Sequence, residues 1–156
     1  MTVGRHDNGQ LLSRSLRRMA AGVHQDMTDI RLPIVHGASA APARRAAEVA
    51  LRAWKALNRV DDVLLVITEL VQNVTQHTDN GGELHLALLP RLILVEVADT
   101  DPLFPTQRRH DLLDIGGRGL MLVAATARTW GCRRTSCAGV AGKVVWARLP
   151  LQVRPL

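Results

Sequence analysis

Aromatic side chains are scarce in this sequence of 156 residues, which has no tyrosine, one phenylalanine and three tryptophans. Proteins that bind single-stranded nucleic acid stack the bases on such side chains, so we expect no direct nucleic-acid binding here. The formal net charge of +6 does not change this expectation, because the arginines that carry it are scattered along the chain. An acidic protein partner, a polyphosphate ligand or an ordinary solvated surface would account for the charge equally well.

Cysteine and long apolar runs are also in short supply. The two cysteines, Cys132 and Cys137, do not form a CxxC pair, so the pattern of a structural zinc site is missing and we expect reduced thiols. No apolar run approaches the ~20 residues that span a bilayer. The N-terminal "MTVGRHDNGQ" lacks the apolar core of a signal peptide. These absences predict a cytoplasmic protein with no membrane contact.

What the chain does have is enough apolar sequence, 47% of its residues, to build the core of one domain. We expect residues 1–30 to be an N-terminal arm, either mobile or a docking helix, and residues 31–152 to form the domain. Patterning in the first half predicts a strand at 31–37, with Pro33 favouring the edge of a sheet, and a helix from 39 to 57 capped by Ser39.

A second helix is expected from Asp61 or Asp62 to the turn "DNGG" at 79–82. The second half predicts an antiparallel pair of strands at 83–89 and 91–99, a lid-like loop at 100–115, a helix from 120 and a closing hairpin around "AGVAG". This order favours an α+β fold, a two-layer sandwich whose mixed, mostly antiparallel sheet is covered by helices on one face.

One helix carries a row of polar side chains in "ELVQNVTQHT". Glu69, Asn73 and His77 are four residues apart, so they lie along one helix face. At 1.5 Å per residue the row extends over ~12 Å, long enough to follow an elongated ligand. The alternative is that this is only the solvated face of an amphipathic helix.

Two further features suggest a binding site. In "GGRGL", Gly116, Gly117 and Gly119 let backbone amides approach an anion at a helix N-terminus, and Arg118 adds a charged fork. A hinge without a ligand is the alternative. Asp99 ends an apolar strand, where its carboxylate could accept a hydrogen bond from an exocyclic amine or could simply begin a turn.

Two familiar nucleotide motifs are excluded. Leu122 occupies the third glycine position of a GxGxxG motif, and "GKV" at Gly142 lacks the serine or threonine of a P-loop.

Taken in order, these segments resemble the GHKL (Bergerat-fold) ATPase family, and most closely its branch of RsbW-like anti-sigma factors with serine-protein kinase activity. "TELVQNVTQH" resembles the N box, "VEVADTDP" and "GGRGLMLV" the two glycine-box regions, and "GKVVWARL" the end of the domain. The resemblance covers residues 32–149.

The resemblance implies roles for the residues of the row. Asn73 would bind Mg²⁺ on the phosphates of ATP, Glu69 would be the catalytic base, and His77 would line the phosphate or ribose side. Mg²⁺ prefers oxygen ligands and keeps several waters, which suits an amide oxygen.

The other motifs receive roles by the same resemblance. Asp99 would read the adenine amine, and the segment from Gly116 to Leu120, with Arg118 within it, would bind the phosphates. An acceptor alone at residue 99 predicts rejection of GTP, whose base presents a carbonyl in place of the amine. The chain departs from the family pattern DxGxG at Asp101 and Leu103, where glycines are expected, so the hinge is stiffer and more acidic.

The resemblance also implies partners: a sigma factor, an anti-anti-sigma protein of the STAS type, and a second copy in a homodimer. Two alternatives remain open, a non-catalytic regulatory module of the same fold and the ATP-binding domain of a two-component sensor kinase.

Overall fold

Five strands form one antiparallel sheet in the computed structural model, which describes residues 27–101, 118–137 and 139–152. Neighbouring strands follow the order β1-β2-β3-β5-β4. Their bounds are β1 Asp29–Ile34, β2 Gly82–Leu89, β3 Leu92–Asp99, β4 Thr129–Cys137 and β5 Val140–Pro150. The predicted edge strand is confirmed, since β1 pairs only with β2 in the described sheet. Nearly all of the arm predicted at 1–30 and of the lid at 100–115 lies outside the described residues.

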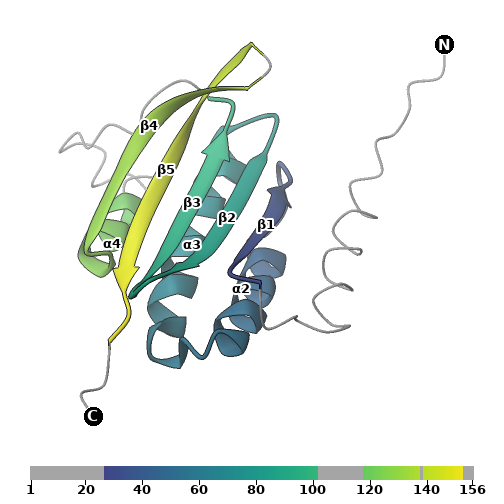
Figure 1. Ribbon diagram of the computed structural model, residues 1–156. Helices are drawn as coiled ribbons and strands as arrows, with labels where there is room; N and C mark the ends of the chain where they lie inside the picture. Colours follow the sequence, from purple (N-terminus) through teal and green to yellow (C-terminus); the bar gives the residue numbers. More distant parts are fainter. Residues whose placement is uncertain (1–26, 102–117, 138, 153–156) are drawn as a thin grey trace.

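Three α-helices of the described chain cover one face of this sheet (Figure 1). They are α2 Ala41–Ala53, α3 Val60–His77 and α4 Arg118–Thr126, with a short 3₁₀ turn η1 Leu57–Arg59 between the first two. The predicted α+β class, one sheet layer under one helix layer, is confirmed. Every described strand pair is antiparallel, so the sheet is more regular than the mixed sheet that was expected.

The central helix α3 forms where the apolar spacing predicts it. Two aspartates lie in its first turn, where they favour the positive end of the helix dipole. Its apolar stripe is fully or almost fully buried against the sheet, as in Val63, Ile67, Leu70 and Val74. Burial of this stripe fixes the rotation of the helix, and therefore also where its polar row points.

Helix α2 is shorter than predicted. It ends at Ala53, and Lys55 then takes a positive φ of 57°, which turns the chain out of the helix. Leu57, the last residue of the predicted helix, is 59% exposed. The cap is also different: Ala40 holds the N-cap position, while Ser39 only accepts a bond from the Ala41 amide at 3.3 Å.

A chain of ion pairs crosses the face of the sheet that the helices leave open. His85 on β2 lies 3.2 Å from Asp29 on β1 and 3.1 Å from Glu96 on β3, and Arg133 on β4 donates to the same glutamate at 2.8 Å. Although partial burial by itself raises the pKa of Glu96, the hydrogen bonds from Arg133 and His85 and their charges outweigh it and lower that pKa. The network therefore joins four of the five strands by side chains.

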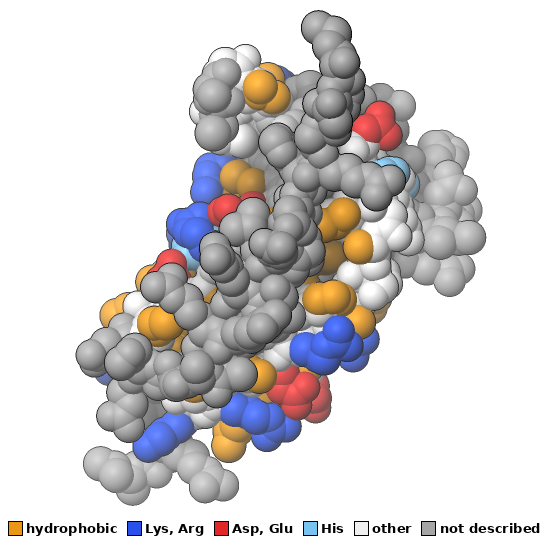
Figure 2. Space-filling model, turned by 90° about the vertical axis from the view of Figure 1, so that its right-hand side faces the viewer, with side chains coloured by type: hydrophobic (Ala, Val, Ile, Leu, Met, Phe, Trp, Pro, Cys, Tyr) orange, Lys and Arg blue, Asp and Glu red, His pale blue; other side chains and the backbone are white. Residues whose placement is uncertain are grey.

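Basic side chains are mixed with acidic and apolar ones on the side of the molecule shown in Figure 2. Arg31 pairs with Glu83 and Arg52 pairs with Glu48, both at 2.8 Å. The positive charge of these residues is thus partly offset locally. No helix within the described ranges is long and apolar enough to cross a membrane.

Candidate functional site

Glu69 and Asn73 lie on the part of α3 that faces the start of α4. A Cβ atom built on Gly119, the second residue of α4, would lie 2.9 Å from Glu69 Oε2 and 3.6 Å from Asn73 Oδ1. The backbone of α4 therefore comes close to both side chains, and a residue larger than glycine at this position would require the Glu69 carboxylate to move. The structure brings together two of the predicted features, the polar row and the glycine-rich helix start.

His77, the third member of the row, differs from the other two. It lies in the last turn of α3 and is exposed, whereas Glu69 and Asn73 are half-buried. Its ring makes no hydrogen bond within the described part of the chain. The geometry therefore separates an inner pair, Glu69 and Asn73, from an outer histidine that is open to a ligand or to solvent.

The glycine-rich segment is only partly described. Gly116 and Gly117 lie outside the described residues, and α4 begins at Arg118, whose side chain is likewise outside them. Leu120 is buried in the core, so only its backbone could contact a ligand. Gly119, in the first turn of α4, lies next to Glu69 and Asn73, so the positive end of the helix dipole is close to these two side chains.

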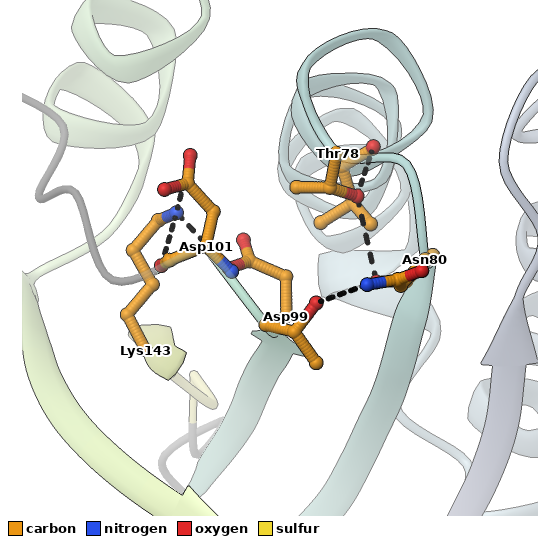
Figure 3. Close-up of polar contacts among 8 residues, drawn as sticks. Thr78, Asn80, Asp99, Asp101 and Lys143 are labelled. Carbon is orange, nitrogen blue, oxygen red and sulfur yellow. Dashed lines mark hydrogen bonds and ion pairs between the residues drawn. The ribbon is translucent and has the colours of Figure 1, made fainter. Parts of the chain in front are cut away.

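Asp99 is almost completely buried at the end of β3, with a side chain 5% exposed. The backbone amide of Asp101 donates to its Oδ1 at 2.9 Å, and Lys143 Nζ on β5 donates to the same oxygen at 3.0 Å (Figure 3). Lys143 also donates to the carbonyl of Asp101 at 3.1 Å, and its Nζ lies 3.6 Å from the carboxylate of that residue. A single ammonium thus holds two carboxylates at the point where the chain leaves the sheet.

Sequence reasoning missed Lys143, although a signal was present. It is one of only two lysines in the chain, and it interrupts an apolar strand in "GKVVWARL". Its strand register places it directly opposite Asp99. A lysine within an apolar strand that is buried is expected to have an acidic partner, because a buried charge is costly unless it is paired.

A short turn joins α3 to β2 and brings the end of α3 close to the end of β3. Gly82, the first residue of β2, pairs with Asp99, and a Cβ on it would come within 3.3 Å of Val74 on α3. Thr78 is buried and donates to the carbonyl of Val74 at 2.7 Å, while Asn80 reaches Thr100 at 3.5 Å (Figure 3). The C-terminal end of the polar row therefore lies near the exit of β3.

A metal ion could not be held here by protein carboxylates and imidazoles alone. Within the described ranges, no three His, Cys, Asp or Glu side chains gather in a way that could hold one. Asn73 Oδ1 offers one oxygen beside the start of α4, and the rest of a shell would have to come from a ligand and water. That donor set fits Mg²⁺ bound to phosphates.

Two subsites result from this geometry. In the first, Glu69 and Asn73 lie beside the N-terminus of α4, which suits the phosphates of a ligand. In the second, the buried carboxylate of Asp99 lies at the end of β3, which suits a hydrogen-bond donor such as an amine.

No curated protein matches the chain with significant similarity. The family model of the histidine kinase-like ATPase domain, however, matches residues 36–149, which is most of the chain and lies within the domain predicted at 31–152. The match spans the polar row on α3, Asp99 and the start of α4. The chain therefore belongs to the family of histidine kinase-like ATPase domains, and ATP is the ligand that this membership implies.

Proposed function

We propose that this protein is an ATP-dependent protein-serine kinase and anti-sigma factor, which sequesters a sigma factor and phosphorylates a STAS-type antagonist that would otherwise release it. The observation that carries the proposal is the contact of Glu69 and Asn73 with Gly119. It puts a carboxylate beside the place where the phosphates of ATP would meet a helix N-terminus. A base at that place is what transfer to a hydroxyl requires.

The proposed reaction uses Glu69 as the base. Its carboxylate takes the proton of the incoming serine hydroxyl, the serine oxygen forms a bond to the γ-phosphorus, and the bond from that phosphorus to the β–γ bridging oxygen breaks, leaving ADP. Asn73 would hold Mg²⁺, which supplies positive charge to the phosphate oxygens. Both side chains are half-buried and lie beside the start of α4.

The test is Glu69→Gln, which keeps the size of the side chain and removes the proton acceptor. Phosphate transfer to the cognate antagonist should fall by ~10² to 10⁴, while ATP affinity should hardly change. The matched control is Glu48→Gln on α2, a helical glutamate paired with Arg52 away from this site. Phosphoserine on the antagonist and nucleotide affinity are measured for each variant, and full transfer by Glu69→Gln would refute the base assignment.

Asn73→Ala should behave differently, because it removes the proposed metal ligand and leaves the base in place. Both Mg²⁺-dependent ATP binding and phosphate transfer should weaken together. ATP affinity that is the same with and without Mg²⁺ in the wild type would contradict the role given to Asn73.

A second candidate is a regulatory module that sequesters its partner without catalysis. The hinge supports it: Lys143 holds both Asp99 and Asp101, so the exit of β3 is fixed by ion pairs where the family pattern has glycine. Such a module would bind the sigma factor equally well with and without ATP. Absence of phosphate transfer by the wild type to any cognate antagonist would favour this candidate over the kinase.

A further inference from the structure

A pocket with apolar walls lies between the end of β1, the start of α2 and α3. Leu32, Ala43 and Val71 each come from one of these elements. The two hydroxyls in its described wall, of Ser39 and Thr75, each bond to the backbone of their own segment. Its cavity volume of about 40 Å³ corresponds to roughly three water molecules at ~10–15 Å³ each, which suits one branched apolar side chain.

This pocket is separate from the candidate nucleotide site. Val71 and Thr75, which line it, each follow Glu69 and Asn73 by two residues. Residues two apart on a helix are about 200° apart around its axis, so the two pairs face opposite sides of α3. The pocket therefore needs an occupant other than ATP.

One flank of α2 continues from the pocket as an apolar stripe. Pro42, which lines the pocket, shares this flank with Val49 and Ala53, because these residues are separated by whole helical turns. Val49 is 45% exposed, so it faces neither the sheet nor α3. The start of α2 meets the end of β1, so α2 runs antiparallel to β1, and its right-handed winding turns the stripe away from α3 (Figure 1). The stripe thus lies at the outer edge of the described helix layer.

The N-terminal arm joins the domain at the other end of this stripe. Met27, the first described residue, accepts a hydrogen bond at 2.6 Å from Nε1 of Trp54, which directly follows α2. The sequence just before it, "LLSRSLRRMAAGV" at 11–23, has a stripe of its own at helical spacing, made of Leu12, Leu16, Met19 and Val23. This segment precedes the family match at 36–149, so family membership assigns it no role.

The contact between Met27 and Trp54 sets the register in which the two stripes would meet. The four residues from Val23 to Met27 can cover the ~8 Å of helix rise that separates Val49 from Trp54. Val23 then comes level with Val49. Leu16 and Pro42 are each seven residues earlier, ~10 Å along their helices, so they come level as well. Leu16 thereby reaches the wall of the pocket.

We propose that residues 12–23 form a helix that docks on the outer flank of α2 in the same chain, with Leu16 in the pocket and Val23 against Val49. The arginines of the segment, Arg14, Arg17 and Arg18, lie on its opposite face and remain in solvent. The docked helix extends the helix layer beyond the edge strand β1. This role does not depend on the nucleotide binding of the proposed function.

Hydrogen exchange on the full chain tests the docking. An isolated helix of this length is marginal in water, so the amides of residues 16–23 in a free arm should exchange within about threefold of an unstructured peptide. In the docked arm they should exchange at least about tenfold more slowly. Wild-type exchange at the free-arm rate would overturn the proposal. Protection that disappears on dilution from about 100 to 1 μM would also overturn it, because that arm would be held by a second copy.

Two pairs of variants test the register. Leu16→Ala should raise the exchange rate of the arm at least about tenfold, whereas Leu11→Ala, the same change off the stripe, should raise it less than about twofold. Val49→Gln should release the arm equally, and Val140→Gln, at an exposed valine on β5, should not. The domain should stay folded in each case, because Val49 and Val140 are exposed and the two leucines precede the described domain. Protection that persists in either Leu16→Ala or Val49→Gln would overturn the proposal.

Discussion

At Gly119, the space that a side chain would need is occupied by the carboxylate of Glu69. In Gly119→Ala the added methyl would meet Glu69 Oε2 at 2.9 Å, so the carboxylate must move. Because the end of a glutamate side chain is flexible and alanine favours a helix by about 0.5–1 kcal/mol, the free energy of unfolding should change by no more than about 1 kcal/mol. Phosphate transfer should fall tenfold or more, since misplacing a catalytic group is costly.

The control for Gly119→Ala is the same change in a Glu69→Ala background. With the carboxylate gone, the methyl no longer displaces anything, and urea unfolding should show the variant to be as stable as its Glu69→Ala parent or more stable. Equal effects of the change in both backgrounds would mean that Gly119 and Glu69 do not interact.

Asp99 is expected to carry much of the affinity for ATP. In Asp99→Asn, Lys143 should hold the amide oxygen, which turns the NH₂ group toward the adenine amine and sets donor against donor. ATP binding should weaken by about 1–3 kcal/mol. Calorimetric titration with ATP gives the measurement, and undiminished affinity would contradict the proposed contact between Asp99 and adenine.

At the scale of elements, the ion-pair chain on the open face of the sheet ties strands that share no backbone hydrogen bonds. Arg133 on β4 reaches Glu96 on β3 although β5 lies between these strands. Glu96 is the centre of the chain, because it also contacts His85 on β2.

Glu96→Gln should therefore destabilise the protein in a pH-dependent way. The folded-state pKa of Glu96 is lowered, so its contribution is present above the unfolded pKa of about 4.3 and is lost as the pH falls through the lower folded value. The wild type should exceed the variant by roughly 0.5–1 kcal/mol at pH 7, a modest figure because Arg133 is half-exposed, and this gap should close at acidic pH. Urea unfolding from pH 7 down to pH 3 measures it.

Glu83→Gln is the matched control for that series. Glu83 pairs with Arg31, but both side chains are at least half exposed, so water screens the pair. Its effect should be smaller than that of Glu96→Gln at neutral pH. A larger effect of Glu83→Gln would show that the partly buried Glu96 contributes less to stability than an exposed ion pair does.

The element boundaries show what pattern alone can predict. Periodicity locates α3 well because its stripe of Val63, Ile67 and Leu70 is buried along its length. It extends α2 too far, because Leu57 continues the spacing and yet lies on the surface after the turn at Lys55. Local pattern cannot tell a buried leucine from an exposed one, since burial is decided by distant segments.

At the scale of the whole molecule, nucleotide binding should stabilise the fold. A ligand present at 100 times its Kd adds about 2.7 kcal/mol to the free energy of unfolding when it binds only the folded state. For a chain of this size the thermal midpoint should rise by roughly 5–10 °C with Mg²⁺ and ATP. Thermal scans at several nucleotide concentrations measure this shift, and a midpoint independent of concentration would speak against a nucleotide site.

The candidate site could be predicted only in part, because contacts between distant segments are not visible in local sequence patterns. Spacing on one helix is a local property, so the row of Glu69, Asn73 and His77 is visible in the sequence. The approach of Gly119 to that row, and of Lys143 to Asp99, depends on how helices and strands pack in three dimensions. The roles assigned to these residues stay predictions until the variants are measured.

The position of β5 in the sheet has a consequence for how the protein is made. This strand comes last in the described chain and yet inserts between β3 and β4, so the sheet cannot be completed during early synthesis. Asp99 leaves the ribosome 44 residues ahead of Lys143, and in the meantime its carboxylate has no ammonium to pair with. A chain that lacks β5 would thus carry the polar row of α3 but not the pair of Asp99 and Lys143. Nucleotide binding, on this view, marks a molecule in which β5 has been synthesised and has inserted into the sheet.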